Sequence, residues 1–326
     1  MAFTRRNFLT TSSAAIAAGT LGRFMWPGFT LSAQGGQQQP PATAVKELRR
    51  NVGIFTGSGG TIGWLVNPAG AVAVDSQFPA TATICVEDLI KRSGKTEIAM
   101  LINTHHHGDH TGGNGVFRPK TAKIVAHANV PKYMKDTYDR TLQQRAAANP
   151  PPTSPAPAEP VVPDTTVTDK WQAAFGDESI RTMHHGPAHT GGDIVILFEK
   201  ANVAHMGDLM FNRMHPVIDR ANGASIKNWI VLLKKVSGEL PADTIYIFGH
   251  AGPGREVTGA RADLLRHADY LEALLAFVGE KIKAGQTRDQ VLALRDIIPG
   301  FDDYGPLTAR PLPAAFDELS AAGGRL

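Results

Sequence analysis

Short apolar runs separated by turn-forming residues make up much of the chain between positions 50 and 250. Runs at 52–56, 61–67 and 71–75 are divided by glycine-rich turns and predict an opening β-meander. Later runs that also predict strands lie at 98–102, 123–127, 194–198, 203–206 and 244–248. Continuous apolar runs of this length are typical of strands buried on both faces, so they favour the inner sheets of a layered α/β protein.

Longer segments with helical spacing lie between and after these runs. Helices are expected over 81–92, 129–148, 225–236 and 258–282, and the leucines of the last helix form an apolar face for the core. The proline-dense stretch at 149–163 cannot continue a helix or a central strand, so it predicts an exposed loop. That loop is either a lid over a functional site or a plain surface excursion.

Residue types that bind metals stand beside the ends of the predicted strands. Five histidines and two aspartates are found there in four separate pieces of the chain: His105, His107, Asp109, His110, His189, Asp208 and His250. Because functional groups gather at one edge of a layered α/β fold, the four pieces are expected to meet in space.

The densest piece is Asn103-Thr104-His105-His106-His107-Gly108-Asp109-His110. In extended chain, alternate side chains share a face, so His105 and His107 can point one way while His106 points elsewhere. Gly108 lets the backbone turn, which can aim Asp109 and His110 at a second ion. Imidazole nitrogens and carboxylate oxygens suit zinc, so the spacing predicts a site for two metal ions.

The chain resembles the metallo-β-lactamase superfamily in His105-x-His107-x-Asp109-His110, followed in the same order by His189, Asp208 and His250. The resemblance spans roughly 45–326 and implies a four-layer αβ/βα sandwich with two Zn²⁺ ions per subunit at one edge. It implies that His105, His107 and His189 hold one zinc, that Asp109, His110 and His250 hold the other, and that Asp208 bridges both. It also places Asp75, after the strand at 71–74, in support of the ligands.

The expected reaction follows from the metals. A water held between two zinc ions loses its proton near neutral pH and becomes a hydroxide nucleophile, which Asp109 would orient as the catalytic carboxylate. No serine or cysteine nucleophile is required, and Cys85 is expected to be a packing residue. The prediction is a hydrolase of an ester, thioester, lactone or amide bond in a small-molecule substrate.

The residue at position 208 bears on the substrate. Zinc β-lactamases of one subclass have a Cys where this chain has Asp208, and the Asp resembles the pattern of glyoxalase II-like thioesterases and lactonases. A β-lactamase is therefore kept as an alternative, together with an iron-dependent oxidoreductase of the same fold and a non-catalytic metal-binding sensor. Candidate substrate contacts are Asn222 and His215, with His185, Arg213, Arg220 and Lys227 as further possibilities.

Composition and the amino terminus complete the picture. The chain has 326 residues, 42% of them hydrophobic, and a net charge of +3 without a strong basic stripe, so no nucleic-acid partner is expected. Arg5-Arg6 and the Ala-rich run after it resemble a twin-arginine signal peptide over 1–33, followed by a flexible tether at 34–44 and a catalytic domain at 45–326. These features predict export by the twin-arginine machinery to the periplasm, with no membrane anchor after processing.

Overall fold

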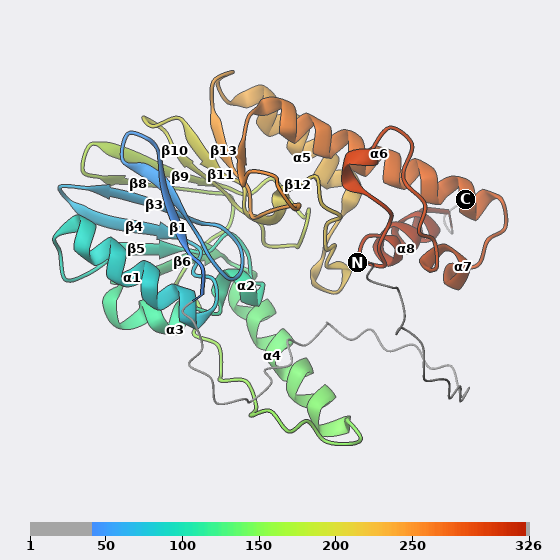
Figure 1. Cartoon of the computed structure of the whole chain (residues 1–326), viewed down its shortest axis with the longest axis horizontal. Coiled ribbons are helices and arrows are strands. Elements are labelled where there is room, and N and C mark those ends of the chain that lie inside the picture. The colour runs from blue at the N-terminus through green and yellow to red at the C-terminus, as the bar shows by residue number, and fades with distance from the viewer. Residues whose placement is uncertain (1–40, 324–326) are drawn as a thin grey trace, which may run out of the picture. The chain divides into compact units, whose positions relative to one another are not determined.

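Two β-sheets lie face to face in the computed structural model, which describes residues 41–323 (Figure 1). Helices cover the outer face of each sheet, so the expected αβ/βα sandwich is confirmed. The predicted signal peptide and most of the predicted tether lie outside the described residues. None of the helices within 41–323 is long and apolar enough to cross a membrane.

The first sheet has seven strands in sequence order. Its first four strands are antiparallel neighbours, whereas the last three are added in parallel. The strands are β1 (Ala44–Arg49), β2 (Val52–Thr56), β3 (Ile62–Asn67), β4 (Gly70–Val74), β5 (Met100–Ile102), β6 (Ile124–His127) and β7 (Thr165–Val167). The carboxyl ends of β4 and β5 therefore lie at the same edge of the sheet.

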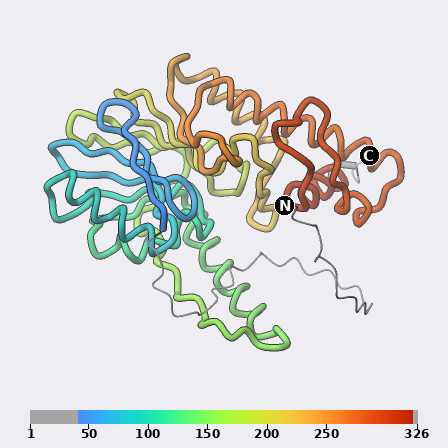
Figure 2. Tube along the Cα trace, in the orientation of Figure 1, coloured from blue at the N-terminus to red at the C-terminus, as the bar shows by residue number. Residues whose placement is uncertain are grey.

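The second sheet has six strands in the order β15-β13-β11-β10-β9-β8. Only β11 and β13 are parallel neighbours in it. Its strands are β8 (Lys170–Phe175), β9 (Glu178–Met183), β10 (Val195–Phe198), β11 (Val203–His205), β13 (Ile245–Ile247) and β15 (Thr258–Gly259). A short parallel pair, β12 (Phe211–Asn212) with β14 (His250–Ala251), lies beyond this sheet. In Figure 2 the strands of the first sheet lie in the blue-to-green part of the trace and those of the second sheet in the yellow-to-orange part.

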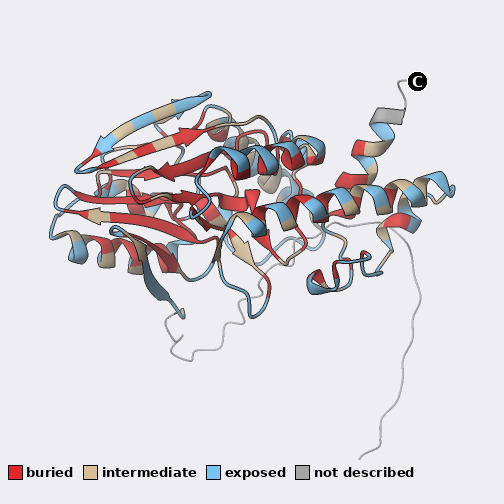
Figure 3. Ribbon diagram, turned by 90° about the horizontal axis from the view of Figure 1, so that it is seen from above, coloured by how far each residue is buried: buried red, intermediate tan, exposed pale blue. Residues whose placement is uncertain are grey.

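The core is built by strands that are buried on both faces (Figure 3). In β4, Val72 and Val74 point into the layer between the sheets, whereas Ala71 and Ala73 face the outer helix. In β10, Ile196 and Phe198 point into the same central layer. Alternation of this kind removes apolar surface from water on both faces, which is the main force that holds the two sheets together.

Each outer layer is made by amphipathic helices. Against the first sheet lie α1 (Pro79–Ser93) and the short α3 (Asn114–Phe117), which bury Cys85 and Leu89, so the thiol is a packing residue as expected. Against the second sheet lie α5 (Ile226–Glu239) and α6 (Arg261–Lys283). Helix α4 (Val130–Ala147) projects from the body, and the proline-rich segment runs back along it (Figure 1).

The strand and helix predictions at these positions are confirmed to within a few residues, and the differences have physical reasons. The long last helix begins at Arg261 rather than at 258, because Thr258 and Gly259 pair with β13. The β8–β9 hairpin was not predicted. Its strand β8 alternates exposed and half-buried residues around Trp171, so it lacks a continuous apolar run. The C-terminal helices α7 (Arg288–Leu292) and α8 (Leu312–Gly323) were not predicted either.

One buried carboxylate fastens α8 to the start of α5. Glu318 accepts hydrogen bonds from the backbone N–H groups of Ile226 (2.9 Å) and Lys227 (3.1 Å), and it also contacts Arg220 at 3.2 Å. These N–H groups belong to the first turn of α5, where no helical partner exists and the helix dipole favours a negative charge. Glu318 therefore links the C-terminal helices to the sandwich.

We predict that Glu318→Ala lowers the free energy of unfolding by about 1–3 kcal/mol, because it leaves buried N–H groups and a cation without their acceptor. Urea denaturation followed by circular dichroism measures this. Glu272→Ala is the matched control, since Glu272 makes an exposed ion pair with Lys234, and such pairs contribute about 0–1 kcal/mol. Equal effects of the two substitutions would show that Glu318 does not fasten α8 to α5.

Candidate metal centre

The seven residues singled out at the strand ends converge at one edge of the sandwich. Their side chains form two groups that share Asp208, and within each group the nearest nitrogen and oxygen atoms lie within 4.8 Å of one another. Strand β5 leads into the segment that carries His105, His107, Asp109 and His110, and β11 leads to Asp208. The structure therefore brings together all seven residues that the sequence indicated.

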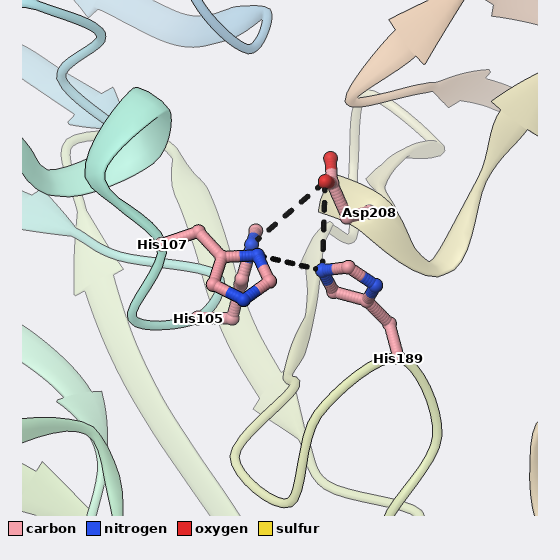
Figure 4. Close-up of side chains that lie close together, drawn as sticks. All are labelled: His105, His107, His189 and Asp208. Carbon is pink, nitrogen blue, oxygen red and sulfur yellow. Dashed lines mark hydrogen bonds and ion pairs between the residues drawn. The ribbon is translucent and has the colours of Figure 1, made fainter. Parts of the chain in front are cut away.

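The first group contains His105, His107, His189 and Asp208, which point toward one another in Figure 4. Asp208 Oδ2 lies 3.5 Å from His189 Nε2 and 3.9 Å from His105 Nε2. His189 Nε2 lies 3.0 Å from His107 Nδ1. The four side chains thus surround one small space from four directions.

The second group contains Asp109, His110, His250 and again Asp208. Asp208 Oδ1 lies 2.9 Å from His110 Nε2 and 3.3 Å from His250 Nε2. Asp109 Oδ2 lies 3.0 Å from His250 Nε2. Asp208 therefore turns one oxygen toward each group.

Asp75 holds the imidazole rings from behind the cluster. This buried carboxylate accepts hydrogen bonds from the Thr104 backbone N–H (2.7 Å), from Thr104 Oγ1 (2.8 Å) and from His110 Nδ1 (2.7 Å). Because Thr104 Oγ1 donates its proton to Asp75, it can accept one from His105 Nδ1 at 3.0 Å. Both histidines then hold a proton on Nδ1, so Nε2 is the nitrogen that each ring turns toward the cluster.

The other two rings of the first group are fixed in the same way. His189 Nδ1 donates to the Val217 carbonyl oxygen at 2.8 Å. In His107 the two ring nitrogens exchange roles. Its Nε2 donates to Asp219 Oδ2 at 3.1 Å, and its Nδ1 faces the cluster. Sequence reasoning missed Asp219, because an aspartate before a turn looks like a simple cap, and it does cap the short turn by accepting from the Asn222 N–H.

The donor set fits a metal ion. Two buried atoms that face the cluster, His105 Nε2 and Asp208 Oδ1, make no hydrogen bond to any residue in the described part of the chain. The 2.9 Å approach of His110 Nε2 to Asp208 Oδ1 is close but lacks the alignment of a hydrogen bond. Unpaired buried polar atoms are costly, and nitrogens bound tetrahedrally to one zinc stand roughly 3.3 Å apart, close to the spacing seen here.

Electrostatics in the cluster keeps its carboxylates ionised. Burial opposes ionisation of both Asp109 and Asp208, but the neighbouring rings of His110 and His250 hold the pKa of Asp208 well below its usual range and lower that of Asp109 to about 2. Burial lowers the pKa of His189 to about 3 and that of His105 well below its usual value. The cluster therefore offers two anionic side chains, Asp109 and Asp208, and two neutral imidazoles, His105 and His189, which is the chemistry of a cation site.

In the second group, the carboxylates raise the pKa values of the histidines. Burial favours the neutral ring of His250, but the Asp208 and Asp109 carboxylates outweigh it and raise the pKa of His250 to about 9. The same balance, with Asp208 and Asp75 as the main anions, raises the pKa of His110 well above its usual value. This side of the cluster attracts positive charge, as a second cation site must.

The two candidate substrate contacts are engaged by the protein itself. Asn222 is buried, donates from Nδ2 to Asp219 Oδ2 at 2.6 Å and lies 3.1 Å from His106 Nε2. His215 is buried, with one ring nitrogen 2.6 Å from the Tyr270 hydroxyl and the other 2.9 Å from the Pro306 carbonyl oxygen. Both side chains therefore hold neighbouring segments in place in this structure.

Of the further candidate substrate contacts, the two arginines form ion pairs within the protein, whereas Lys227 and His185 are at least partly exposed. Arg213 pairs with Asp263 and Asp303, and Arg220 pairs with Glu318, so both stabilise the C-terminal part. Lys227 is exposed, and His185 is half-buried beside Lys235 and Glu239. The remaining histidines pack or bond inside the fold: His205 contacts the Thr61 carbonyl, His127 stacks on His184, and His267 stacks on Tyr270 and Tyr304.

We predict that Asp219→Asn weakens zinc binding about 10–100-fold, because loss of the anion releases His107 from its orientation. Competition with a chromogenic chelator measures the affinity, and circular dichroism verifies that the fold is retained. Asp139→Asn is the matched control, since Asp139 only pairs with Lys135 on the surface of α4. Unchanged zinc affinity in Asp219→Asn would show that His107 is held by other contacts.

Comparison with known proteins agrees with this geometry. Residues 56–250 match the family model described as the metallo-beta-lactamase superfamily. A probable metallo-hydrolase of Methanocaldococcus jannaschii is 28% identical over 199 residues, which are 59% of this chain and 88% of that protein. A hydroxyacylglutathione hydrolase of Chelativorans sp. is 25% identical over 227 residues, covering 66% and 72% of the two chains.

Among solved structures, a metallo-beta-lactamase from Pontibacter korlensis superposes with a TM-score of 0.55 at 16% identity, covering 71% of this chain and 99% of that one. At this identity the likeness concerns the fold, and it agrees with the two sheets and outer helices seen here. The family match covers more than half of the chain and includes every residue of the cluster. The chain is a metal-dependent hydrolase that belongs to the metallo-beta-lactamase superfamily.

Proposed function

We propose that the protein is a binuclear zinc hydrolase that cleaves an ester, thioester, lactone or amide bond in a small molecule. The observation that carries this proposal is the position of Asp208, whose two oxygens each face one group of histidines. A carboxylate placed in this way suits a bridge between two ions. Five imidazoles in the set favour zinc over magnesium or calcium, which prefer oxygen ligands.

The two groups divide the ligands. His105, His107 and His189 would hold one ion, Asp109, His110 and His250 the other, and Asp208 would contact both. When bound, zinc supplies Lewis acidity that makes water nucleophilic at neutral pH and polarises the bond under attack.

The chain's own residues determine the direction of approach. Most of the cluster is buried, but Asp109 and His250 each keep 22% of their side chain exposed. His107, which precedes Gly108 in the chain as Asp109 follows it, is also partly exposed. A substrate is therefore expected to reach the cluster over this rim, where the ionised Asp109 can orient a water molecule by accepting a hydrogen bond.

The bond type is proposed from the ligand at position 208. An aspartate there differs from the cysteine of one β-lactamase subclass and resembles the pattern of glyoxalase II-like thioesterases. One relative of the chain is named hydroxyacylglutathione hydrolase. We therefore place ester and thioester cleavage before lactam cleavage. A β-lactamase, an iron-dependent oxidoreductase and a metal sensor each predict a different outcome in the test below.

The test is a panel of aryl esters, thioesters, lactones and a chromogenic cephalosporin, offered to the zinc-loaded protein with and without a chelator. We expect chelator-sensitive cleavage of an ester or thioester and two equivalents of zinc by mass spectrometry. Cleavage of the cephalosporin alone would favour a β-lactamase. Bound redox-active iron with oxygen uptake would exclude the hydrolase. If no substrate of the panel is cleaved although the metal is retained, the sensor would be favoured.

In the same assay, Asp208→Ala is expected to retain less than half of the metal and to lose at least about 100-fold in kcat/KM, because it removes the ligand that both groups share. Asp88→Ala is the control, since Asp88 only pairs with Arg92 on the surface of α1. Full metal occupancy and activity in Asp208→Ala would contradict a bridging role.

We further propose that the twin-arginine machinery exports the protein to the periplasm, on the basis of Arg5-Arg6 and the Ala-rich run that follows. Replacing both arginines with lysine is expected to leave the protein in the cytoplasm, because this export route reads the arginine pair. Immunoblots of periplasmic and cytoplasmic fractions measure the result. Periplasmic protein in equal amount from the lysine variant would contradict this route.

A further inference from the structure

A cavity of about 620 Å³ lies directly beside the segment that carries the metal-binding residues. Helix α4 forms one wall with Met134, Thr137 and Thr141, and the proline-rich segment forms the opposite wall from Pro157 to Val161. Helices α2 (Gly108–Thr111) and α3, with Phe78 in front of α1, complete it. The volume is in the usual range for small-molecule sites.

The cavity is chemically suited to an uncharged, apolar group. Its lining includes Phe78, Val116, Met134 and Val161, and Glu159 is the one charged residue among the described residues that line it. Phe78 leaves 43% of its surface exposed beside this apolar lining. A ligand that covered these side chains would gain from the removal of apolar surface from water.

The proline-rich wall is fixed in place. Asn114 donates a hydrogen bond to the Val161 carbonyl oxygen at 3.0 Å, and Val161 packs against the outer core of the first sheet. Arg145, near the end of α4, donates to Ser154 at 3.2 Å. The protein's own contacts therefore hold this wall in place, and the segment expected to be a lid or a surface excursion lines the cavity.

The cavity reaches the segment that carries the metal-binding residues at His106 and Gly108. Gly108 is exposed and lines the cavity between His107 and Asp109, the residues that form the accessible rim of the cluster. His106 also lines it and is only 3% exposed. Its Nε2 lies 3.3 Å from Asp219 Oδ2, whereas its Nδ1 has no hydrogen-bond partner among the described residues. An unpaired buried nitrogen of this kind points to a group that a ligand or a water supplies.

We infer that this cavity binds the apolar acyl or aryl part of the substrate and thereby selects esters or thioesters of uncharged, medium-length acids. The inference rests on the proposed function, because it places the scissile bond at the rim and the acyl chain between α4 and the proline-rich segment. Selection follows from burial, since each methylene that enters an apolar pocket is worth about 0.8 kcal/mol, or roughly a 4-fold gain in affinity.

The first test measures binding without turnover. The zinc-loaded protein is titrated with the uncharged fluorescent probe N-phenyl-1-naphthylamine, which is then displaced by 1-decanol, an uncharged alcohol that has no bond for a hydrolase to cleave. Thr137→Trp and Thr141→Trp place an indole in the cavity and are each expected to weaken binding of the probe at least about 10-fold. Gln144→Trp is the control, because Gln144 is exposed on α4 and does not line the cavity.

The second test uses p-nitrophenyl esters from acetate to decanoate. The kcat/KM of the unmodified protein is expected to rise roughly 4-fold per added methylene until the cavity is filled. Thr137→Trp and Thr141→Trp are expected to flatten this rise, whereas Gln144→Trp is expected to leave the rise unchanged.

The two tests separate the two proposals. Probe binding that both tryptophan variants abolish, without hydrolysis of any ester, would uphold the cavity and overturn the esterase activity. Ester hydrolysis that is independent of chain length, with probe binding equal in all four proteins, would overturn the cavity and leave the hydrolase. The assignment of this apolar site to the acyl part of the substrate stands only if kcat/KM rises with chain length and both tryptophan variants lose that rise.

Discussion

The metal centre depends on how the nitrogens that face away from it are held. A histidine can offer a lone pair to a metal only if its proton sits on the other nitrogen, and a fixed acceptor decides which nitrogen that is. Here Asp75, Thr104, the Val217 carbonyl and Asp219 serve four of the rings. The cluster can therefore converge only where these acceptors are already in position. Asp75 holds its carboxylate in place with a backbone in the left-handed region (φ 65°), which is uncommon for residues other than glycine.

Strand pairing in the two sheets brings these acceptors and the metal-binding residues together. Parallel pairing of β4 with β5 places Asp75 beside Thr104, and the Asp75 N–H bonds to the Ile102 carbonyl at 2.8 Å. Parallel pairing of β11 with β13 likewise brings the segments that carry Asp208 and His250 to one edge. Close approach then requires glycine: a Cβ at Gly249 would lie 2.0 Å from Asp208 Oδ1, and one at Gly60 would lie 2.1 Å from the His110 ring. Backbone pairing and these glycines together define the size of the cluster.

Sequence patterns predicted the features that are encoded locally. The apolar runs of β2 and β10 and the cluster segment after β5 could be read directly, because burial on both faces and motif spacing leave a signal within a few residues. Asp219 and Glu318 left no such signal, since each is defined by a partner more than 90 positions away. The contact of Asn222 with His106, 116 positions away, likewise left no signal in the sequence, which indicated only a substrate contact for Asn222.

Asp219 also connects the metal centre to the cavity. Its Oδ2 lies 3.1 Å from His107 Nε2 and 3.3 Å from His106 Nε2, so one carboxylate holds a ring that faces the metal and a ring that lines the cavity. Because both rings are anchored to the same atom, a ligand that shifts His106 must also change the hydrogen bonding of His107. The ring of Tyr133, 5.2 Å from that of His106, limits such a shift from the side of α4. The arrangement therefore favours a rigid pocket in which an apolar group is positioned relative to the metals by packing, rather than one that closes around its ligand.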